Sequence, residues 1–156
     1  MTRVKIRQAA RDEAETIRDL INLAFRVEEF FVYGDRIAID EVRERLETGE
    51  FWIAEDGGTA AGCVYLESRG QRGYLGLLSV DPARQRKGLG RLLMAAAEAR
   101  CREMGCRVMD LLTVNLRVEL PGFYRSLGYA ECGTEPFPAH VPTKLPCHFV
   151  KMTKAL

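Results

Sequence analysis

Apolar and polar residues alternate with two different periods along the 156-residue chain. At the start, Val4-Lys5-Ile6-Arg7 alternates strictly, which is typical of a half-buried strand. Apolar residues then recur every three or four positions, which predicts a helix capped by Asp12. The inner face of this helix comprises Ile17, Leu20, Ile21, Ala24 and Phe25. A second helix is predicted to end at Thr48-Gly49, with its inner face formed by Ile39, Val42 and Leu46.

The rest of the chain consists of short apolar runs separated by turn residues. These runs predict strands over Phe51–Glu55, Ala61–Glu67, Tyr74–Val80, Val108–Val114, Tyr129–Gly133 and Cys147–Thr153. A long helix with the apolar stripe Leu89, Leu92, Leu93 and Ala96 ends near Gly105, and Pro121 and Gly128 delimit a short one. This order of strands and helices predicts one domain, residues 1–156, with a mixed sheet and helices on its faces.

Composition and charge exclude several classes of protein. A net charge of +1 argues against a protein that binds nucleic acid over a large surface. We expect no secretory signal and no membrane span, because no apolar run is long enough. Five cysteines without a CxxC pair favour reduced thiols and a cytoplasmic location. Neighbouring residues of a strand point to opposite faces, so Cys147-His148 predicts no metal site.

One stretch has the composition of an anion-binding site. The apolar run that ends at Val80 is followed by the turn Asp81-Pro82, then by a basic, glycine-containing loop and a helix. The N–H groups of a first helical turn are unpaired, and glycine lets an anion approach the backbone closely. The positive charges around this turn are Arg84, Arg86, Lys87 and Arg91. A phosphate or pyrophosphate group is therefore the expected ligand, although a basic solvated helix start has the same composition.

The residues of this loop distinguish between known phosphate-binding motifs. A Walker loop requires GxxxxGK followed by Ser or Thr, which is absent. The dinucleotide-binding fingerprint GxGxxG does not match either, because no third glycine follows Gly88-Leu89-Gly90 at the required spacing. The segment Gln85-Arg86-Lys87-Gly88-Leu89-Gly90 resembles the Q/R-x-x-G-x-G/A loop of the GNAT superfamily of N-acetyltransferases. Leu120 to Tyr129, LPGFYRSLGY, is similar to a second motif of that family, and the order of elements also matches.

The resemblance implies an α/β (α+β) fold and a cofactor. The fold is a mixed, mostly antiparallel seven-stranded sheet with four helices, splayed between the fourth and fifth strands. The loop amides would hold the pyrophosphate of acetyl-CoA, and no metal is expected. The implied cofactor-binding residues are Leu78, Ser79, Val80, Gln85, Arg86, Lys87, Gly88, Leu89, Gly90, Arg91 and Asn115. Leu78 and Val80 are also plausible core residues, and Asn115 also fits a residue that ends a strand.

The resemblance also assigns chemical roles. A backbone N–H near Leu78 would polarise the thioester carbonyl. Tyr124 matches a tyrosine beside the coenzyme A sulfur, where a phenol protonated at neutral pH can donate a proton. The alternative for Tyr124 is a packed aromatic ring. The general base is not identified, because residues 74–80 contain neither Glu nor His; the candidates are Glu67, Glu28 and Glu29.

The acceptor site is expected between the first helix pair and the loop from Pro136 to Pro146. Its candidate residues are Glu28, Glu29, Phe31, Tyr33 and Glu67. Aromatic walls with carboxylates suit a cationic amine, so we expect a small amine or amino-acid derivative; a peptide N-terminus stays open. His140 and His148 are expected to be structural. The leading hypothesis is an acetyl-CoA-dependent N-acetyltransferase, the alternative is a non-catalytic acyl-CoA-binding module, and a homodimer is compatible with either.

Overall fold

The computed structural model describes residues 3–85 and 87–156. Its elements follow the order expected from the hydrophobic pattern. The strands are β1 (Val4–Gln8), β2 (Glu50–Asp56), β3 (Thr59–Arg69), β4 (Arg72–Val80), β5 (Val108–Val114), β6 (Ala130–Pro136) and β7 (His148–Ala155). The helices are α1 (Ala14–Ala24), α2 (Ile39–Thr48), α3 (Leu89–Glu103) and α4 (Leu120–Ser126), with the 3₁₀ helices η1 (Arg11–Glu13), η2 (Phe25–Glu28) and η3 (Pro82–Arg84).

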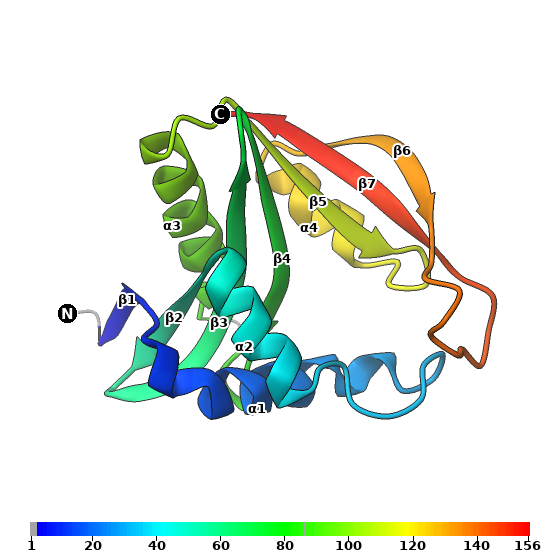
Figure 1. Ribbon diagram of the computed structural model, residues 1–156, viewed down its shortest axis with the longest axis horizontal. Helices are drawn as coiled ribbons and strands as arrows, with labels where there is room; N and C mark the ends of the chain where they lie inside the picture. Colours follow the sequence, from blue (N-terminus) through cyan, green and yellow to red (C-terminus); the bar gives the residue numbers. More distant parts are fainter. Residues whose placement is uncertain (1–2, 86) are drawn as a thin grey trace.

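The seven strands form one sheet in the order β1-β2-β3-β4-β5-β7-β6. All neighbours are antiparallel except β4 and β5, which are parallel. Their pairing runs only from Arg72↔Val108 to Leu75↔Leu111, whereas β4 continues to Val80. The two strands therefore diverge, and the gap between them widens away from the C-terminus in Figure 1. This architecture confirms the expected mixed, splayed sheet with four helices.

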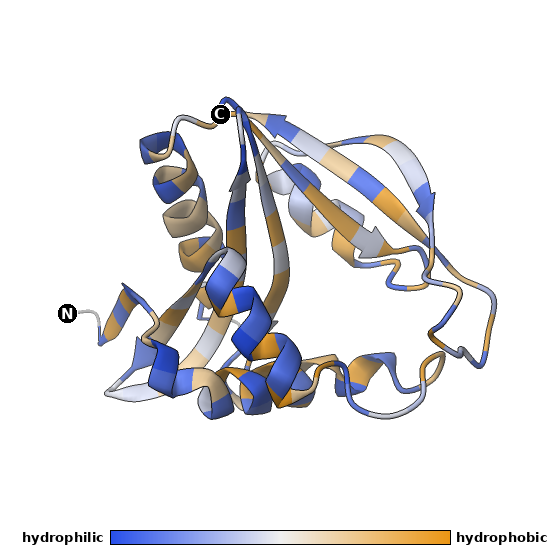
Figure 2. Cartoon of the chain, in the orientation of Figure 1, coloured by the Kyte–Doolittle hydropathy of each residue, from blue (hydrophilic) through white to orange (hydrophobic). Residues whose placement is uncertain are grey.

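Helices cover both faces of the sheet. The side chains of neighbouring residues in a strand therefore pack in different cores. Ile53 packs in the core under α1 and α2, whereas Ala54 packs in the core under α3 and α4. In Figure 2 the middle strands are mostly apolar, while α2 is mostly polar and buries only Val42. The burial of both faces of β3 explains its continuous apolar sequence.

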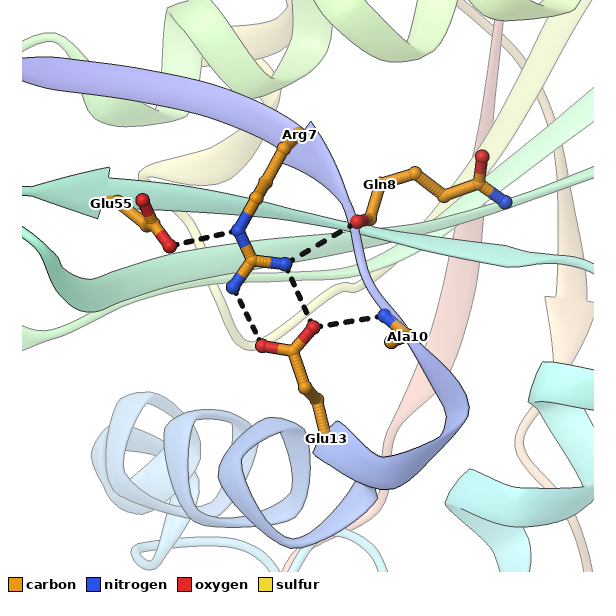
Figure 3. A network of polar contacts seen from close by, with 5 residues as sticks. All are labelled: Arg7, Gln8, Ala10, Glu13 and Glu55. Carbon is orange, nitrogen blue, oxygen red and sulfur yellow. Dashed lines mark hydrogen bonds and ion pairs between the residues drawn. The ribbon is translucent and has the colours of Figure 1, made fainter.

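The start of the first helix differs from the prediction. Asp12 lies in η1 and makes no capping bond to α1. Glu13 instead accepts a hydrogen bond from the Ala10 N–H (2.9 Å), as Figure 3 shows. The Arg7 guanidinium donates to both oxygens of the same carboxylate (2.7 and 2.6 Å) and also to Glu55 (2.8 Å). The predicted Asp12 cap is wrong, because the longer Glu13 side chain reaches both the backbone and Arg7.

The inner face of α3 is also rotated relative to the prediction. Leu92 is 43% exposed, although it was expected in the apolar stripe. The buried positions Leu89, Leu93, Ala97 and Cys101 recur every four residues instead. Leu92 precedes Leu93 by one residue, or about 100° of helix rotation, so it points to the outside.

Candidate functional site

The connection between β4 and α3 places a basic loop at a helix N-terminus. The Asp81 carboxylate accepts a hydrogen bond from the Ala83 N–H (2.9 Å), and this bond starts η3 directly after β4. Gly88 precedes α3 with a left-handed φ of 74°, which favours glycine. No side chain among the described residues caps this N-terminus. The unpaired N–H groups of its first turn are therefore available to an anion.

A cavity of about 350 Å³ lies against this helix start. Its lining consists of Val80, Gln85, Gly88, Leu89, Gly90, Arg91 and Phe123. All but Phe123 belong to the set that the sequence predicts to bind the cofactor. The partial positive charge of a helix N-terminus and the Arg91 guanidinium both favour a negatively charged occupant.

Two basic residues of the loop form ion pairs with one carboxylate. Asp56, at the end of β2, accepts hydrogen bonds from Lys87 Nζ (2.9 Å) and Arg84 Nη1 (3.1 Å). The hydrogen bond from Lys87 and the neighbouring Arg84 hold the pKa of Asp56 below its usual range. The sequence gives no sign that Asp56 binds these two residues, because Asp56 stands in an ordinary hairpin-turn pattern. Its structural role is to tie the loop to the β2–β3 hairpin.

Arg91 is held differently from these two residues. Its guanidinium lies over the Phe123 ring, 5.7 Å from the centroid, and donates to Ser126 Oγ (3.0 Å). Arg91 therefore joins the start of α3 to α4 on the wall of the cavity. Arg86, also predicted to bind the cofactor, lies outside the described residues.

A second cavity, of about 300 Å³, opens where β4 and β5 diverge. Residues of both strands line it, together with residues of the α1–α2 connection, α4 and the β6–β7 loop. Phe123 lines both cavities, so the two are neighbours. We call the first cavity, at the start of α3, the anion cradle. The gap in the sheet thus leads from the anion cradle toward the α1–α2 connection.

The backbone of β4 is distorted beside this second cavity. Tyr65 of β3 pairs with Gly76, but Cys63 pairs with Ser79, so Leu77 and Leu78 together face Val64. Leu77 has a φ of 56°, and it is the non-glycine residue with positive φ in the described chain. Such a conformation costs about 1–3 kcal/mol and is concentrated at functional sites. The bulge re-aims the backbone at Leu78, where the resemblance implies a carbonyl-polarising N–H.

Tyr124 extends from α4 toward this cavity. Its side chain is buried, and burial raises the pKa of its hydroxyl to about 12. Among the described residues no group forms a hydrogen bond with this hydroxyl. The ring packs edge-on against Phe123 (5.2 Å) and Tyr129 (6.0 Å). The phenol is therefore fixed by packing while its hydroxyl stays free to bond a ligand.

Tyr129 is in turn anchored by a buried carboxylate. Its hydroxyl donates to Glu98 of α3 (2.9 Å), and Lys154 Nζ donates to the other oxygen of Glu98 (2.8 Å). The Tyr129 N–H also bonds the Tyr124 carbonyl (3.1 Å). This cluster connects α3, α4 and β7 and fixes the end of α4 from which Tyr124 projects.

Glu28 and Arg117 form an ion pair on the wall of the same cavity. Arg117 Nη1 lies 2.9 Å from Glu28 Oε2, and Arg117 Nε lies 2.6 Å from Glu119. The Glu28 and Arg117 side chains are only 6% and 15% exposed. Burial raises the pKa of Glu28, although Arg117 opposes this effect. The sequence gives no local signal for Arg117, because its partner Glu28 lies 89 positions earlier.

The other predicted acceptor-site residues are divided. Tyr33 lines the cavity and is 60% exposed. Phe31 is fully buried, and the exposed Glu29 uses its carbonyl to accept a hydrogen bond from Lys144. Glu67 pairs with Arg69 (2.8 Å). These last three are absent from the described lining of the cavity, so Glu28 is the predicted carboxylate that the fold brings next to Tyr124.

The predicted cofactor residues Ser79 and Asn115 have bonds within the protein. Ser79 is buried and its hydroxyl donates to the Leu77 carbonyl (2.9 Å), which supports the bulge. Asn115 exchanges hydrogen bonds with the His148 backbone, accepting from its N–H through Oδ1 (2.8 Å) and donating its own N–H to the His148 carbonyl (2.9 Å). Asn115 thus fixes the ends of β5 and β7 beside the cavity. The exposed His140 stands in the β6–β7 loop.

One buried hydroxyl in the gap has no partner. Thr113 is 4% exposed, lines the cavity, and its Oγ1 forms no hydrogen bond with the described residues. An unpaired buried hydroxyl costs about 1–3 kcal/mol. Valine has nearly the same shape and would avoid this cost, so the sequence retains a polar atom in the gap at the expense of stability.

The remaining expectations concern metals, membranes and thiols. Within residues 3–85 and 87–156 no group of three potential ligands is arranged for a metal ion. The described helices include none that is long and apolar enough to cross a bilayer. The cysteines are free thiols, and burial raises the pKa of Cys63 to about 12, so this thiol is a poor nucleophile.

Comparisons with known proteins agree with this geometry. A model of the Acetyltransferase (GNAT) family matches residues 14–129. The Danio rerio protein named "Probable N-acetyltransferase 14" is 35% identical over 94 residues, which are 58% of this chain. The chain matches only 33% of that relative's length.

Solved structures share the fold over nearly the whole chain. The ribosomal-protein-alanine N-acetyltransferase from Brucella melitensis has a TM-score of 0.80 at 19% identity, covering 97% of this chain and 99% of its own. PaiA N-acetyltransferase from Thermoplasma acidophilum, in complex with coenzyme A, has a TM-score of 0.79 at 15% identity, covering 98% of this chain and 99% of its own. The family model spans most of the chain, from α1 to the start of the last hairpin. This protein therefore belongs to the acetyltransferase (GNAT) family.

Proposed function

We propose that this protein transfers the acetyl group of acetyl-CoA to a primary amine of a small molecule or amino-acid derivative, by direct attack in a ternary complex. The observation that carries this proposal is the position of Glu28 and Tyr124. A carboxylate with a raised pKa and a buried phenol that bonds none of the described residues line one cavity, next to an anion cradle. These are the groups that proton transfer during amide formation requires.

The residues of the cradle fit the cofactor. Leu89, Gly90 and Arg91 begin a helix that no described side chain caps, against a cavity large enough for a pyrophosphate group. Beyond Leu75 the diverging strand β4 offers backbone groups for the amides of a pantetheine arm. Bound there, acetyl-CoA supplies an acetyl group activated as a thioester. The backbone N–H at Leu78 then polarises the carbonyl as an oxyanion-type donor.

Glu28 acts as the general base in this proposal. Burial raises its pKa, which makes the carboxylate a stronger base than an exposed one. Arg117, at 2.9 Å, keeps the carboxylate oriented and lets it remain charged inside the protein. A cationic amine first loses one proton to solvent and attacks in its neutral form. Glu28 accepts the second proton, which the nitrogen loses as it becomes an amide nitrogen. Glu29 and Glu67, the other candidates, lie outside the described lining.

Tyr124 acts as the general acid. Its pKa of about 12 keeps the hydroxyl protonated throughout the physiological range. It faces the same cavity as Glu28, so both groups can serve one reacting carbonyl. The Tyr124 hydroxyl donates its proton to the leaving sulfur, which then departs as a neutral thiol.

The acceptor end of the cavity favours an amine with an apolar body. Its walls include Phe25, Tyr33, Phe137 and Phe149, and its charged floor is the Glu28–Arg117 pair. Aromatic faces attract a cationic amine, and a carboxylate orients it. We further propose a cytoplasmic location, which the free thiols support.

The test measures binding and turnover separately. A panel of primary amines is incubated with the protein and labelled acetyl-CoA, while coenzyme A binding is measured by thermal shift. The proposal expects both a rise in melting temperature and amine-dependent formation of labelled amide. Binding without turnover of any amine would favour the non-catalytic acyl-CoA-binding module, and absence of binding would contradict both functions.

A further inference from the structure

Two loops that lie far apart in the sequence run side by side below the open end of the gap. Residues 25–38 connect α1 to α2, and residues 137–147 connect β6 to β7; Figure 1 shows both at the wide end of the splay. We call them together the acceptor strap. Val32 and Thr143 form an isolated antiparallel bridge between them.

Further bonds fasten the strap around Lys144. Its backbone N–H donates to the Phe31 carbonyl (2.8 Å), and its Nζ donates to the Glu29 carbonyl (2.8 Å). The same ammonium group lies 5.2 Å from the centre of the Tyr33 ring. Backbone, side-chain and cation–π contacts thus join the two loops at four of the five residues from Glu29 to Tyr33.

The strap is also anchored at its ends. The Asn22 amide donates to the Ile37 carbonyl and accepts from the Ile37 N–H, both at 3.0 Å, which closes the first loop at its base. Phe31 is fully buried inside this loop. In the second loop Phe137 packs on Phe149 of β7, with 5.1 Å between ring centres. The strap is therefore a fixed wall and not an open flap.

This wall limits what can enter the cavity. Members of both loops line it, on one side Val32 and Tyr33 and on the other Phe137, Pro138 and Val141. The enclosed space of about 300 Å³ is at the lower end for small-molecule sites. A peptide acceptor needs room for the chain that follows its reacting amine, whereas here the two loops are bonded to each other at the wide end of the splay. The exposed side chains at the rim are Tyr33, Asp35 and Arg36, which leaves an entrance for a compact molecule.

From these contacts we infer that the acceptor is a small free amine with an apolar body, and that the strap excludes the amines of peptides and proteins. This inference rests on the proposed acetyl transfer and adds that the strap excludes peptide and protein acceptors. The amine reaches Glu28 past the rim, and its apolar body lies against the aromatic walls. The strap stays closed during turnover, because a small acceptor does not need it to open.

The first test compares matched acceptors. 2-Phenylethylamine and free phenylalanine are compared with the tetrapeptide Phe-Ala-Ala-Ala and with a lysine-containing peptide. We expect kcat/KM for the peptides to be lower by about a hundredfold or more, since the closed wall clashes with a continuing chain. A smaller difference overturns the inference but leaves acetyl transfer intact. If no amine reacts while coenzyme A binds, the proposed function itself fails.

The second test locks the strap. Val32→Cys and Thr143→Cys are combined in a background with Cys132→Ser and Cys147→Ser, because antiparallel neighbours are close enough for a disulfide. Initial rates of labelled amide formation from 2-phenylethylamine are compared for the oxidised and reduced forms of this one variant. The inference expects rates equal within about threefold. A larger loss on oxidation, restored by dithiothreitol and absent from the Val32→Cys single variant, shows that the strap must open and overturns the inference.

Discussion

The two halves of the site are built in different ways. Apart from Phe123, the described lining of the anion cradle lies between Val80 and Arg91, and the cradle depends on backbone geometry at the start of α3. The acceptor half is assembled from distant segments: Glu28 pairs with Arg117, and Val32 pairs with Thr143. A site of backbone N–H groups requires only a glycine loop before a helix, whereas a site of side chains requires the whole fold. We therefore expect the cofactor half to depend less on the rest of the chain than the acceptor half does.

The largest expected effect concerns proton donation in the shared cavity. Replacing Tyr124 by Phe removes the buried hydroxyl and should lower kcat about 10²–10⁴-fold, with little change in coenzyme A affinity. The matched control is Tyr129→Phe, which removes a hydroxyl bonded to Glu98 and should lower the melting temperature more than kcat. Single-turnover rates and thermal shifts separate the two effects. An unchanged rate for Tyr124→Phe would remove the proposed acid.

The acceptor half is tested next through its buried carboxylate. Glu28→Gln should lower kcat/KM about a hundredfold, because the amide cannot accept the amine proton. In the unchanged protein, activity should rise with pH through the raised pKa of Glu28, since only the carboxylate is a base. That acidic limb should disappear in Glu28→Gln. Glu29→Gln changes the exposed neighbour and is the control, so its activity should still rise with pH in the acidic range. If activity rises with pH in both variants, Glu28 is not the general base.

The cofactor half is tested by backbone geometry alone. Gly88→Ala places a Cβ at a φ of 74°, which costs about 1–2 kcal/mol, and should weaken coenzyme A binding about tenfold by distorting the cradle. Gly105→Ala at the other end of α3 has a φ of 89° and equally open surroundings, so it carries the same strain. Titration of both variants with coenzyme A measures the difference. If both substitutions weaken coenzyme A binding equally, the start of α3 has no special role in binding.

How far the sequence predicts each half follows from the range of the interactions. The strand Val108–Val114 and the turn at Asp81-Pro82 were predicted correctly, because alternation and turn residues are local signals. The Asp12 cap was wrong, because the neighbouring Glu13 accepts the hydrogen bonds of the Ala10 N–H and of Arg7. The role of Arg117 and the bonds of the strap could not be read from the chain, since their partners are about a hundred residues away. Glu28 was one of three equal candidates until the fold separated them.

A smaller effect concerns stability in the gap. Thr113→Val removes an unpaired buried hydroxyl and should raise the free energy of unfolding by about 1–2 kcal/mol. Thr113→Ser keeps the hydroxyl and loses a methyl group, so it should be less stable than the unchanged protein. Urea unfolding of the three proteins gives the order. A Thr113→Val protein that is less stable would show that the hydroxyl has a partner.

The smallest effect is expected far from the site, in the network of Figure 3. Arg7 lowers the pKa of Glu13 to about 2, so this pair stabilises the fold above the ordinary pKa of a glutamate and loses its contribution as pH falls toward 2. Glu13→Gln should therefore be less stable at pH 7, by about 1 kcal/mol, but equal to the unchanged protein near pH 2. Urea unfolding at both values checks the sign. Neither half of the site should change its kinetics in this variant.

The most direct test of the central claim is a crystal structure of the protein with coenzyme A. The account predicts the pyrophosphate within hydrogen-bonding distance of the backbone N–H groups at the start of α3, and the sulfur near the Tyr124 hydroxyl. A coenzyme A molecule seated elsewhere, or with its sulfur away from the gap between β4 and β5, would contradict it.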